Sequence, residues 1–180
     1  LLNNPSLTRS EIKASFASLT IASAAVGVVL VHKDLTQYKH RLLGGYSQAA
    51  SQFNNLCRGN DDPKTPIDNW LPLMKTDAET MMREGCRLAG QTWDHTKKIL
   101  EWVNDDVNHV FCHQVGHGHR KLLYETLSLE LEKDFSTLEY LGNTGAASLP
   151  STLALGAEKG LLESGDRIAL LGIGSGLNSL

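Results

Sequence analysis

Cysteine and basic residues are both scarce in this chain. Three of the 180 residues are cysteine, an odd number without the spacing of a metal site, which fits a reducing cytoplasm better than a disulfide framework. Lysine and arginine total 17 against 20 acidic residues, and without a basic surplus nucleic acid is not an expected partner. The longest apolar run, residues 21–31, is too short to span a bilayer. We therefore predict a cytoplasmic protein without a membrane span.

The two ends of the sequence lack further features. No basic segment followed by an apolar one marks a signal peptide near the start. No initiator methionine is present at Leu1, and the chain stops at Leu180 inside an expected strand. We therefore expect a fragment or one chain of a pair. In it, residues 1–17 would end a preceding segment, and residues 18–180 would form a domain truncated at both ends.

What is present alternates between strand and helix patterns. Residues 18–31 are nearly continuous in apolar and β-branched character, which is typical of a strand buried on both faces, and residues 40–53 indicate a second strand. Three prolines favour a loop over residues 54–72. Two further strands are expected at 107–112 and 167–173. The alternation predicts an α/β fold with a layered core.

Helical segments are expected between these strands. Thr76 and Glu79 form a capping-box pattern, with Thr76 as the N-cap. The helix that follows has small and apolar residues at a spacing of three to four, and a second helical stretch covers residues 94–104. The expected buried face of the first helix consists of Ala78, Met81, Met82, Gly85, Leu88, Ala89 and Trp93.

Two shorter helices are expected later in the chain. Residues 118–129 are predicted to be helical, and their inward residues are expected to be Leu122, Leu123, Thr126 and Leu127. The last helix starts at Ser148 or Leu149, since Pro150 fits a first turn, and Gly160 fits the position after the C-cap. Its predicted buried stripe is Leu149, Leu153 and Ala157. The glycines at 172, 174 and 176 then allow a tight turn before the last strand.

Two polar residues occupy positions where chemistry is common. His113 ends a short apolar strand, and Asn143 sits between glycines in a small-residue loop just before a helix. Both side chains can donate a hydrogen bond, and both lie where loops leave secondary structure. Taken singly, His113 is more often a core histidine bonded to a backbone carbonyl, and Asn143 is more often an ordinary turn residue.

The flanks of these two residues carry a family resemblance. Residues 109–116, with Cys-His-Gln, and residues 141–150, with Gly-Asn-Thr-Gly-Ala-Ala-Ser-Leu-Pro, resemble the C-terminal half of a β-ketoacyl-ACP synthase III of the thiolase superfamily. The glycine-rich segment 172–178 resembles the closing loop of that half. In detail the chain is similar to the branch that condenses two long acyl chains head to head, as in bacterial olefin biosynthesis. The resemblance runs from about residue 18 to residue 180. It implies the C-terminal half of the layered α-β-α-β-α thiolase fold.

The resemblance implies roles for these residues. His113 and Asn143 would hold the carbonyl of a second acyl thioester as it becomes an enolate. Backbone N–H groups of the loop Gly172-Ile173-Gly174 would stabilise the oxyanion on the acyl-enzyme side. The implied reaction is Claisen condensation of acyl-CoA or acyl-carrier-protein thioesters in fatty acid and lipid metabolism. The resemblance further implies no metal or redox cofactor, and a dimer of complete subunits.

None of the three cysteines suits the nucleophile that these enzymes use. Cys112 adjoins His113, but neighbours on a strand point to opposite faces. Cys86 falls within an amphipathic helix and is expected to be a core thiol. Cys57 lies beside Arg58 in an irregular loop, and the positive charge of Arg58 would favour a lowered thiol pKa. In the resembled enzymes the nucleophilic cysteine belongs to the N-terminal half, so we expect it from such a half, in the same chain or a separate one.

Three rival interpretations stay open. His113, His117 and His119 stand at spacings that zinc ligands use, although Gly116 and Gly118 interrupt a helix there. The glycines at 172, 174 and 176 give a weak dinucleotide-loop pattern without a following helix. A rival of another class is a non-catalytic thiolase-fold partner or scaffold subunit of a condensing enzyme, which the absence of a suitable cysteine favours.

The sequence also departs from the common synthase III pattern beside the histidine. Val115-Gly116 follow Gln114 where Ala-Asn is usual, and His117 and His119 stand where an arginine is expected. This departure falls in the region that the family uses to contact the acyl carrier or CoA.

Overall fold

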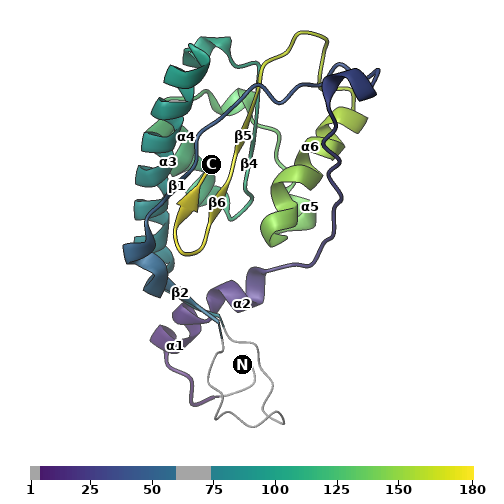
Figure 1. The fold of residues 1–180 in the computed structure, drawn as a ribbon. Helices are drawn as coiled ribbons and strands as arrows, with labels where there is room; N and C mark the ends of the chain where they lie inside the picture. Colours follow the sequence, from purple (N-terminus) through teal and green to yellow (C-terminus); the bar gives the residue numbers. More distant parts are fainter. Residues whose placement is uncertain (1–4, 60–73) are drawn as a thin grey trace.

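A pair of parallel strands forms the centre of the computed structural model, which describes residues 5–59 and 74–180 (Figure 1). Strand β4 (His109–Cys112) pairs with β5 (Ile168–Leu171), with His109 opposite Ile168 and Cys112 opposite Leu171. Helices α3 and α4 lie on one side of this pair, and α5 and α6 lie on the other (Figure 1). Strand β4 is buried by both layers, which explains its unbroken apolar sequence.

Six α-helices and five short 3-10 turns are described in residues 5–59 and 74–180. The α-helices are α1 (Arg9–Ala14), α2 (Phe16–Thr20), α3 (Ala78–Leu100), α4 (His117–Leu127), α5 (Leu138–Leu141) and α6 (Ser148–Glu158). The 3-10 turns are η1 (Lys33–Leu35), η2 (Ser51–Leu56), η4 (Asn104–Asp106), η5 (Leu131–Lys133) and η6 (Gly145–Ala147).

Two small antiparallel sheets complete the described architecture. Strand β7 (Asn178–Ser179) lies between β1 (Gln48–Ala49) and β6 (Ile173–Gly174). Strand β2 (Cys57–Arg58) pairs with β3 (Lys75–Thr76). The first of these sheets continues from β5, because only Gly172 separates β5 from β6. The chain therefore passes directly from the central parallel pair into the β6–β7 hairpin.

The main core lies between α3, α4 and the parallel strands. Its buried members are Cys86, Ala89, Trp93, Val107, Val110, Cys112, Leu123, Tyr124, Leu127, Leu129, Ala169 and Leu171. A smaller cluster of Ala50, Leu88 and Leu177 joins η2 and the hairpin to α3. Since α3 contributes to both clusters, it holds the parallel pair and the hairpin together.

The α/β prediction is confirmed, but the predicted strand over residues 18–31 is wrong. The helix α2 ends at Thr20, and Ile21 makes a single bridge to Asn143. From there the chain is extended but outside any sheet, passing α6 and crossing above it before returning to β1 (Figure 1). An apolar β-branched segment becomes a strand only where neighbouring strands supply hydrogen bonds, and none of the described strands lies beside it.

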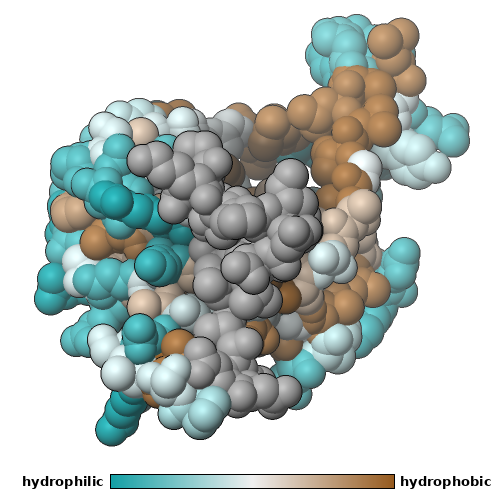
Figure 2. Space-filling view, turned by 90° about the horizontal axis from the view of Figure 1, so that it is seen from below, coloured by the Kyte–Doolittle hydropathy of each residue, from teal (hydrophilic) through white to brown (hydrophobic). Residues whose placement is uncertain are grey.

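This extended segment leaves an apolar surface exposed. Hydrophobic residues gather on a part that projects from the body in Figure 2, on the side where Figure 1 places the segment. Val28, Val29 and Leu30 are 67%, 85% and 76% exposed. Among the described helices, none has the combined length and apolarity that crossing a membrane requires.

Three other predictions near the start of the chain need correction. Only Gln48–Ala49 of the predicted strand 40–53 pairs with a neighbour, and the 3-10 helix η2 follows it. Within the predicted loop 54–72, residues 60–73 lie outside the described residues, and Cys57–Arg58 form β2. The N-cap of α3 is Asp77, whose side chain accepts from the Thr80 N–H. A carboxylate one residue later thus replaces the hydroxyl of Thr76, which lies in β3.

Helix α3 differs from the predictions in length, and helix α4 differs in its buried face. The predicted stretches 78–93 and 94–104 form one helix, α3, which ends at the C-cap Glu101 with a left-handed backbone; no proline interrupts it. On α4, Tyr124 is buried and Thr126 is exposed, so the inward face is rotated from the prediction.

Helix α6 presents small residues to the core instead of its leucines. Ser148, Thr152 and Gly156 are buried, whereas Leu149 and Leu153 are half-buried and Ala157 is exposed. The predicted stripe was therefore wrong by one position. A Cβ on Gly156 would lie 2.7 Å from Cε1 of Phe111, so the missing side chain lets α6 approach β4 closely. The predicted role of Gly160 after the C-cap is confirmed by its φ of +73°.

Candidate active site

His113 leaves the sheet at the carboxyl end of the parallel pair. Its backbone N–H donates a 2.9 Å hydrogen bond to the Leu171 carbonyl, which extends the ladder by one residue beyond β4. Loops at the carboxyl ends of parallel strands are the usual ligand-binding edge of α/β sheets. The half-buried ring makes no hydrogen bond to any described residue. Burial lowers the pKa of His113, so its imidazole is neutral near pH 7 and carries one free N–H donor.

Gln114 fixes the loop that follows His113 through three hydrogen bonds to neighbouring residues. The side chain is 2% exposed, its Nε2 donates to the Cys112 carbonyl at 2.8 Å, and its Oε1 accepts from Ser136 Oγ at 2.9 Å. Its backbone N–H donates to Ser148 Oγ at 3.1 Å. A fully bonded buried amide of this kind holds one rotamer. Gln114 thus fixes the exit direction of the chain directly after His113.

Asn143 is held in the loop between α5 and η6. Its Oδ1 accepts the Gly145 N–H at 3.0 Å, and its carbonyl accepts the Ala22 N–H at 2.7 Å. Gly142 precedes it with a φ of +66°, a conformation that favours glycine. Because Oδ1 is used as an acceptor, the orientation of the amide is set, and Nδ2 makes no hydrogen bond to a described residue. Asn143 therefore retains two unspent N–H donors.

The two motifs are joined by a single hydrogen bond. Gln114 directly follows His113, and Ser148 opens the helix that follows the Asn143 loop. The Gln114 to Ser148 bond therefore ties both loops to the buried edge of α6. Neither Gln114 nor Ser148 stood out in the sequence, although both lie inside the two motifs that carry the resemblance.

A buried charged cluster contacts Cys112, the residue directly before His113. The Asp134 side chain is fully buried; it forms an ion pair with Arg120 and accepts from the Tyr124 hydroxyl at 2.6 Å. The Cys112 thiol also points at Asp134, with 3.6 Å between Sγ and Oδ1. These contacts join β4 and α4 to the segment after η5. Sequence reasoning missed Asp134, because its partners become neighbours only through the fold.

Two of the three cysteines are buried thiols. Burial, together with the Asp134 carboxylate, raises the pKa of the Cys112 thiol, and burial raises the pKa of Cys86 to about 11. Both thiols are therefore protonated near pH 7 and weak nucleophiles. Cys57 is half-buried in β2, and the Thr76 hydroxyl lies 3.8 Å from its sulfur.

The glycine-rich loop offers fewer free donors than the sequence suggests. Gly172 exchanges both backbone hydrogen bonds with Leu180, at 2.9 and 3.0 Å, so its N–H is not available to a ligand. Ile173 faces Ser179 in the next pair of the ladder. Hydrogen-bonded and non-bonded pairs alternate in antiparallel strands, so the Ile173 N–H points away from β7 and the Gly174 N–H points toward it. Of the three predicted groups, only the Ile173 N–H is directed away from the hairpin.

The zinc interpretation lacks a converging ligand set. His117 is exposed at the start of α4, whereas His119 is buried. Within residues 5–59 and 74–180, no three histidine, cysteine or acidic side chains gather as metal ligands would. The helix begins at His117 despite the glycines on either side of it.

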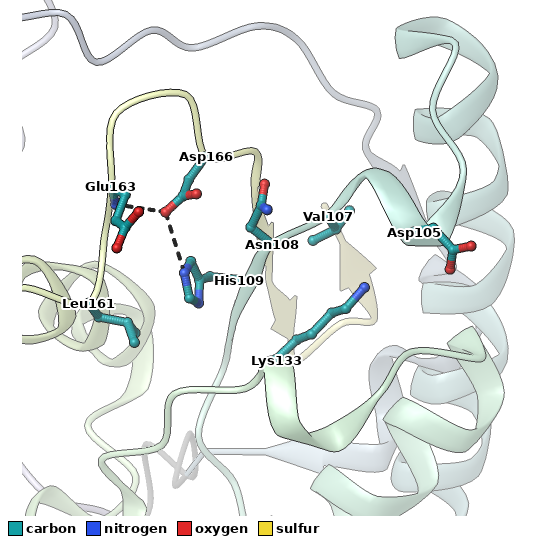
Figure 3. A pocket seen from close by; sticks show the side chains of 8 residues that line it. All are labelled: Asp105, Val107, Asn108, His109, Lys133, Leu161, Glu163 and Asp166. Carbon is teal, nitrogen blue, oxygen red and sulfur yellow. Dashed lines mark hydrogen bonds and ion pairs between the residues drawn. The ribbon is translucent and has the colours of Figure 1, made fainter.

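A cavity of about 500 Å³ lies at the opposite end of β4 from His113. Figure 3 shows its lining, where His109 Nε2 lies 3.4 Å from Asp166 Oδ2 and the Glu163 N–H also donates to Asp166. This is the amino end of the parallel pair. His109 belongs to the first motif and lines this cavity, whereas His113 follows the other end of β4, so the cavity is separate from His113.

Parts of the chain match known proteins. Residues 99–179 match the family described as 3-oxoacyl-[acyl-carrier-protein] synthase III C terminal. The acyl-CoA:acyl-CoA alkyltransferase of Shewanella oneidensis is 40% identical over 177 residues, which cover 96% of this chain and 50% of that protein. The β-ketoacyl-[acyl-carrier-protein] synthase III of Clostridium beijerinckii is 35% identical over 126 residues, which cover 68% of this chain and 39% of that protein.

The solved structures agree with the sequence relatives. A variant of Xanthomonas campestris OleA with bound lauric acid and lauroyl-CoA aligns with a TM-score of 0.84 and 32% identity, covering 99% of this chain and 50% of OleA. The predicted resemblance to the C-terminal half of a synthase III-like enzyme, and to its head-to-head condensing branch, is therefore confirmed, as is the thiolase fold. The chain spans half or less of the length of these proteins.

Proposed function

We propose that the chain, whose residues 99–179 match the family described as 3-oxoacyl-[acyl-carrier-protein] synthase III C terminal, is part of an acyltransferase that joins two acyl thioesters by Claisen condensation. The observation that carries the proposal is that two residues keep unspent donors: His113 at the carboxyl end of the parallel strands, and Asn143 in the loop whose following helix is bonded to Gln114. Both similar relatives named above are enzymes of acyl-thioester chemistry, an alkyltransferase of acyl-CoA and a β-ketoacyl synthase.

The reaction has two half-steps. A cysteine thiolate first attacks one acyl thioester and expels its thiol carrier, which leaves an acyl-enzyme. The second thioester then loses an α-proton to a base, or an α-carboxylate as CO₂, and becomes an enolate. The enolate carbon attacks the acyl-enzyme carbonyl, and the resulting oxyanion expels the cysteine thiolate as the β-keto product forms. Both oxyanions need hydrogen-bond donors aimed at them before they appear.

His113 and Asn143 supply donors for the enolate. A neutral imidazole N–H and an amide N–H stabilise a developing negative charge without transferring a proton at pH 7. The lowered pKa of His113 keeps the ring in that neutral form. The Ile173 N–H is the group of the glycine-rich loop that would serve the oxyanion of the acyl-enzyme; Gly172 and Gly174 shape the loop.

The remaining parts of the active site come from outside this chain. The buried, protonated thiols of Cys86 and Cys112 are unsuited to attack, and Cys57 lies in the β2–β3 strand pair. We propose that the nucleophilic cysteine belongs to an N-terminal half, in the same or a separate chain. We further propose that the complete subunits form a dimer in the cytoplasm, use acyl-CoA or acyl-carrier-protein thioesters, and need no metal or redox cofactor.

Replacement of the two donors tests the proposal in the complete protein. His113→Ala and Asn143→Ala should each lower the condensation rate by about 10²-fold or more, the cost of removing an oxyanion donor. His40→Ala and Asn54→Ala remove the same groups at exposed positions and should leave the rate unchanged.

The same variants separate the enzyme from its main rival. In a non-catalytic scaffold subunit that only sets chain length in a partner synthase, His113→Ala and Asn143→Ala would leave the condensation rate near the wild-type value. That outcome would remove the catalytic role and support the scaffold.

A further inference from the structure

Residues 23–31 form an apolar segment that the described part of the chain leaves uncovered. The segment contains no charged residue, and every residue in it is exposed. Val29 and Leu30, near its end, are 85% and 76% exposed. In Figure 2 hydrophobic residues gather on the projecting part of the molecule, on the side where Figure 1 places this segment. Contiguous apolar surface that is left exposed marks an interaction site.

The backbone of this segment is also without partners in the described part of the chain. It is extended, yet none of its N–H or carbonyl groups bonds a residue within 5–59 or 74–180. Side chains of a strand alternate between two faces, so Val28 and Leu30 share one face and Val29 lies on the other. Strands that are apolar on both faces are typical of sheets covered on both sides. The segment therefore has the sequence of an internal strand but not the neighbours of one.

The amino end of the segment is fixed beside the candidate site. The Ala22 N–H donates to the Asn143 carbonyl at 2.7 Å, and Ile21 forms a parallel bridge with Asn143. A Cβ on Gly142 would lie 3.8 Å from the Cβ of Ala22, so the two chain segments are in contact. The exposed segment thus begins directly after the residue that holds the Asn143 backbone.

The N-terminal half proposed above is the partner that fits this segment. The OleA structure with bound lauric acid and lauroyl-CoA aligns with 99% of this chain, which includes nearly all of the segment, but the aligned region is only 50% of OleA. Pairing with the same segment of a second copy would give a two-stranded ribbon, which is marginal by itself and leaves both apolar faces open. A partner that contributes its own sheet buries the backbone edges and the faces together.

We propose that residues 23–31 dock as a β-strand into a sheet of the N-terminal half, and that the docked strand positions Asn143 through the Ala22 N–H. Strands on both edges would bond the backbone of the segment, and both apolar faces would be buried. Docking would fix the Asn143 carbonyl, while the Gly145 N–H fixes its side-chain oxygen. The strand pairing rests on the proposed N-terminal half, and only the expected effect on rate rests on the proposed reaction.

Hydrogen exchange of the complete protein, measured by mass spectrometry, tests the strand without an activity assay. The amides of residues 23–31 should exchange about 10²-fold or more slowly than those of an unstructured peptide with the same sequence. The amides of β4, which are bonded within the described chain, provide the reference for a protected strand. Exchange of residues 23–31 at the rate of the unstructured peptide would overturn the inference.

Photo-crosslinking of the complete protein identifies what covers the segment. Leu30→photo-leucine changes the side chain little, and on illumination it should link to a peptide outside residues 1–180. Leu123→photo-leucine is the control, because Leu123 is 1% exposed in the core and should link within residues 1–180. If Leu30→photo-leucine links only within residues 1–180, a second copy or this chain itself covers the segment, and that result or the absence of any link overturns the inference.

Ala22→Pro removes the N–H that holds Asn143. Ile21 has a φ of −74° and a ψ of 136°, a conformation that suits a residue before proline, so the path of the chain is kept. The variant should lower kcat by about 10-fold or more, as expected for a misplaced donor, with little change in KM. Ala22→Gly keeps the N–H and should recover most of the rate. A wild-type kcat in Ala22→Pro would overturn the positioning of Asn143.

A second variant decides the question if circular dichroism shows that Ala22→Pro does not fold. Val29→Thr places a hydroxyl in the docked strand, and it should lower the exchange protection of residues 23–31 and kcat together. Val29→Ile keeps an apolar, β-branched side chain and is the matched control. Lowered protection with a wild-type kcat in Val29→Thr would overturn the positioning of Asn143.

The outcomes for this inference and for the proposed function are separable. Protection of residues 23–31 together with full activity in His113→Ala would keep the docked strand and remove the proposed function. Exchange of residues 23–31 at the unstructured rate together with an inactive His113→Ala would do the reverse.

Discussion

The backbone N–H of Gln114 donates a 3.1 Å hydrogen bond to Oγ of Ser148. Both residues are 2% exposed, so the bond lies in the interior. It joins the loop that carries His113 to the helix that follows Asn143, and thereby couples the positions of the two donors that the proposed chemistry needs.

Ser148→Ala should weaken both stability and catalysis. The substitution leaves a buried N–H without an acceptor, which costs about 1–3 kcal/mol, and it frees the His113 loop from α6. Urea unfolding and the condensation rate of the complete protein measure the two effects. Ser151→Ala is the control, because Ser151 is half-buried on the same helix and its side chain bonds no described residue. Equal stability of the two variants would contradict this role for Ser148.

Asp134→Asn should be strongly destabilising. The change removes the charge that compensates Arg120 and weakens the acceptor of the Tyr124 hydroxyl, and breaking one side of a buried ion pair costs about 3 kcal/mol or more. Denaturant unfolding measures the loss. Glu125→Gln breaks the exposed pair with Lys121 and should change stability little. If Asp134→Asn is as stable as Glu125→Gln, the buried cluster does not support α4.

Gly156→Ala should destabilise the protein although alanine favours helix. The new methyl would stand 2.7 Å from the Phe111 ring, and overpacking of this kind costs about 1–3 kcal/mol. Gly118→Ala is the opposite case, since no heavy atom lies within 4 Å of a Cβ there, and helix propensity predicts a gain of up to about 1 kcal/mol. Thermal unfolding should therefore shift in opposite directions for the two variants.

The burial of His119 predicts a loss of stability in mild acid. Its pKa is about 4 in the folded state and about 6.5 when unfolded, so the unfolded state binds more protons between these values. The contribution of neutral His119 to the free energy of unfolding is fully present above about pH 6.5. It is lost as the pH drops toward 4, by about 3 kcal/mol in total. Unfolding curves at pH 7 and pH 5 measure the change, and His119→Leu should reduce this pH dependence. An equal dependence in the variant would contradict burial of a neutral ring.

The sequence predicted correctly those elements that are specified by residues close to one another in the chain. The strand at His109–Cys112, the helix start at Ser148 and the turn at Gly160 were all indicated by residues within a few positions. The strand predicted at 18–31 was wrong. An apolar, β-branched pattern predicts a strand buried between other elements, and no described strand or helix buries this segment. The predicted buried stripe of α6 was wrong because α6 packs against Phe111, a residue distant in the sequence. Only the face that carries Gly156 leaves room for the Phe111 ring.

Some residues of the candidate site could be recognised from the sequence, and others could not. His113 and Asn143 were recognisable because each sits in a distinctive motif, and their catalytic roles stay predictions. Gln114, Ser148 and Asp134 gave no comparable signal, since their hydrogen bonds depend on which loops the fold brings together. The Gly172 N–H donates to the Leu180 carbonyl because of the register of the hairpin, and glycine spacing alone does not reveal that register.

The central claim is that this chain supplies donors that polarise a thioester, while the acylated cysteine lies outside it. Mass spectrometry tests this most directly, by mapping the acyl group after the complete protein reacts with lauroyl-CoA alone. We expect a lauroyl adduct on a cysteine outside residues 1–180, with Cys57, Cys86 and Cys112 unmodified. A stoichiometric adduct on any of these three cysteines would contradict it.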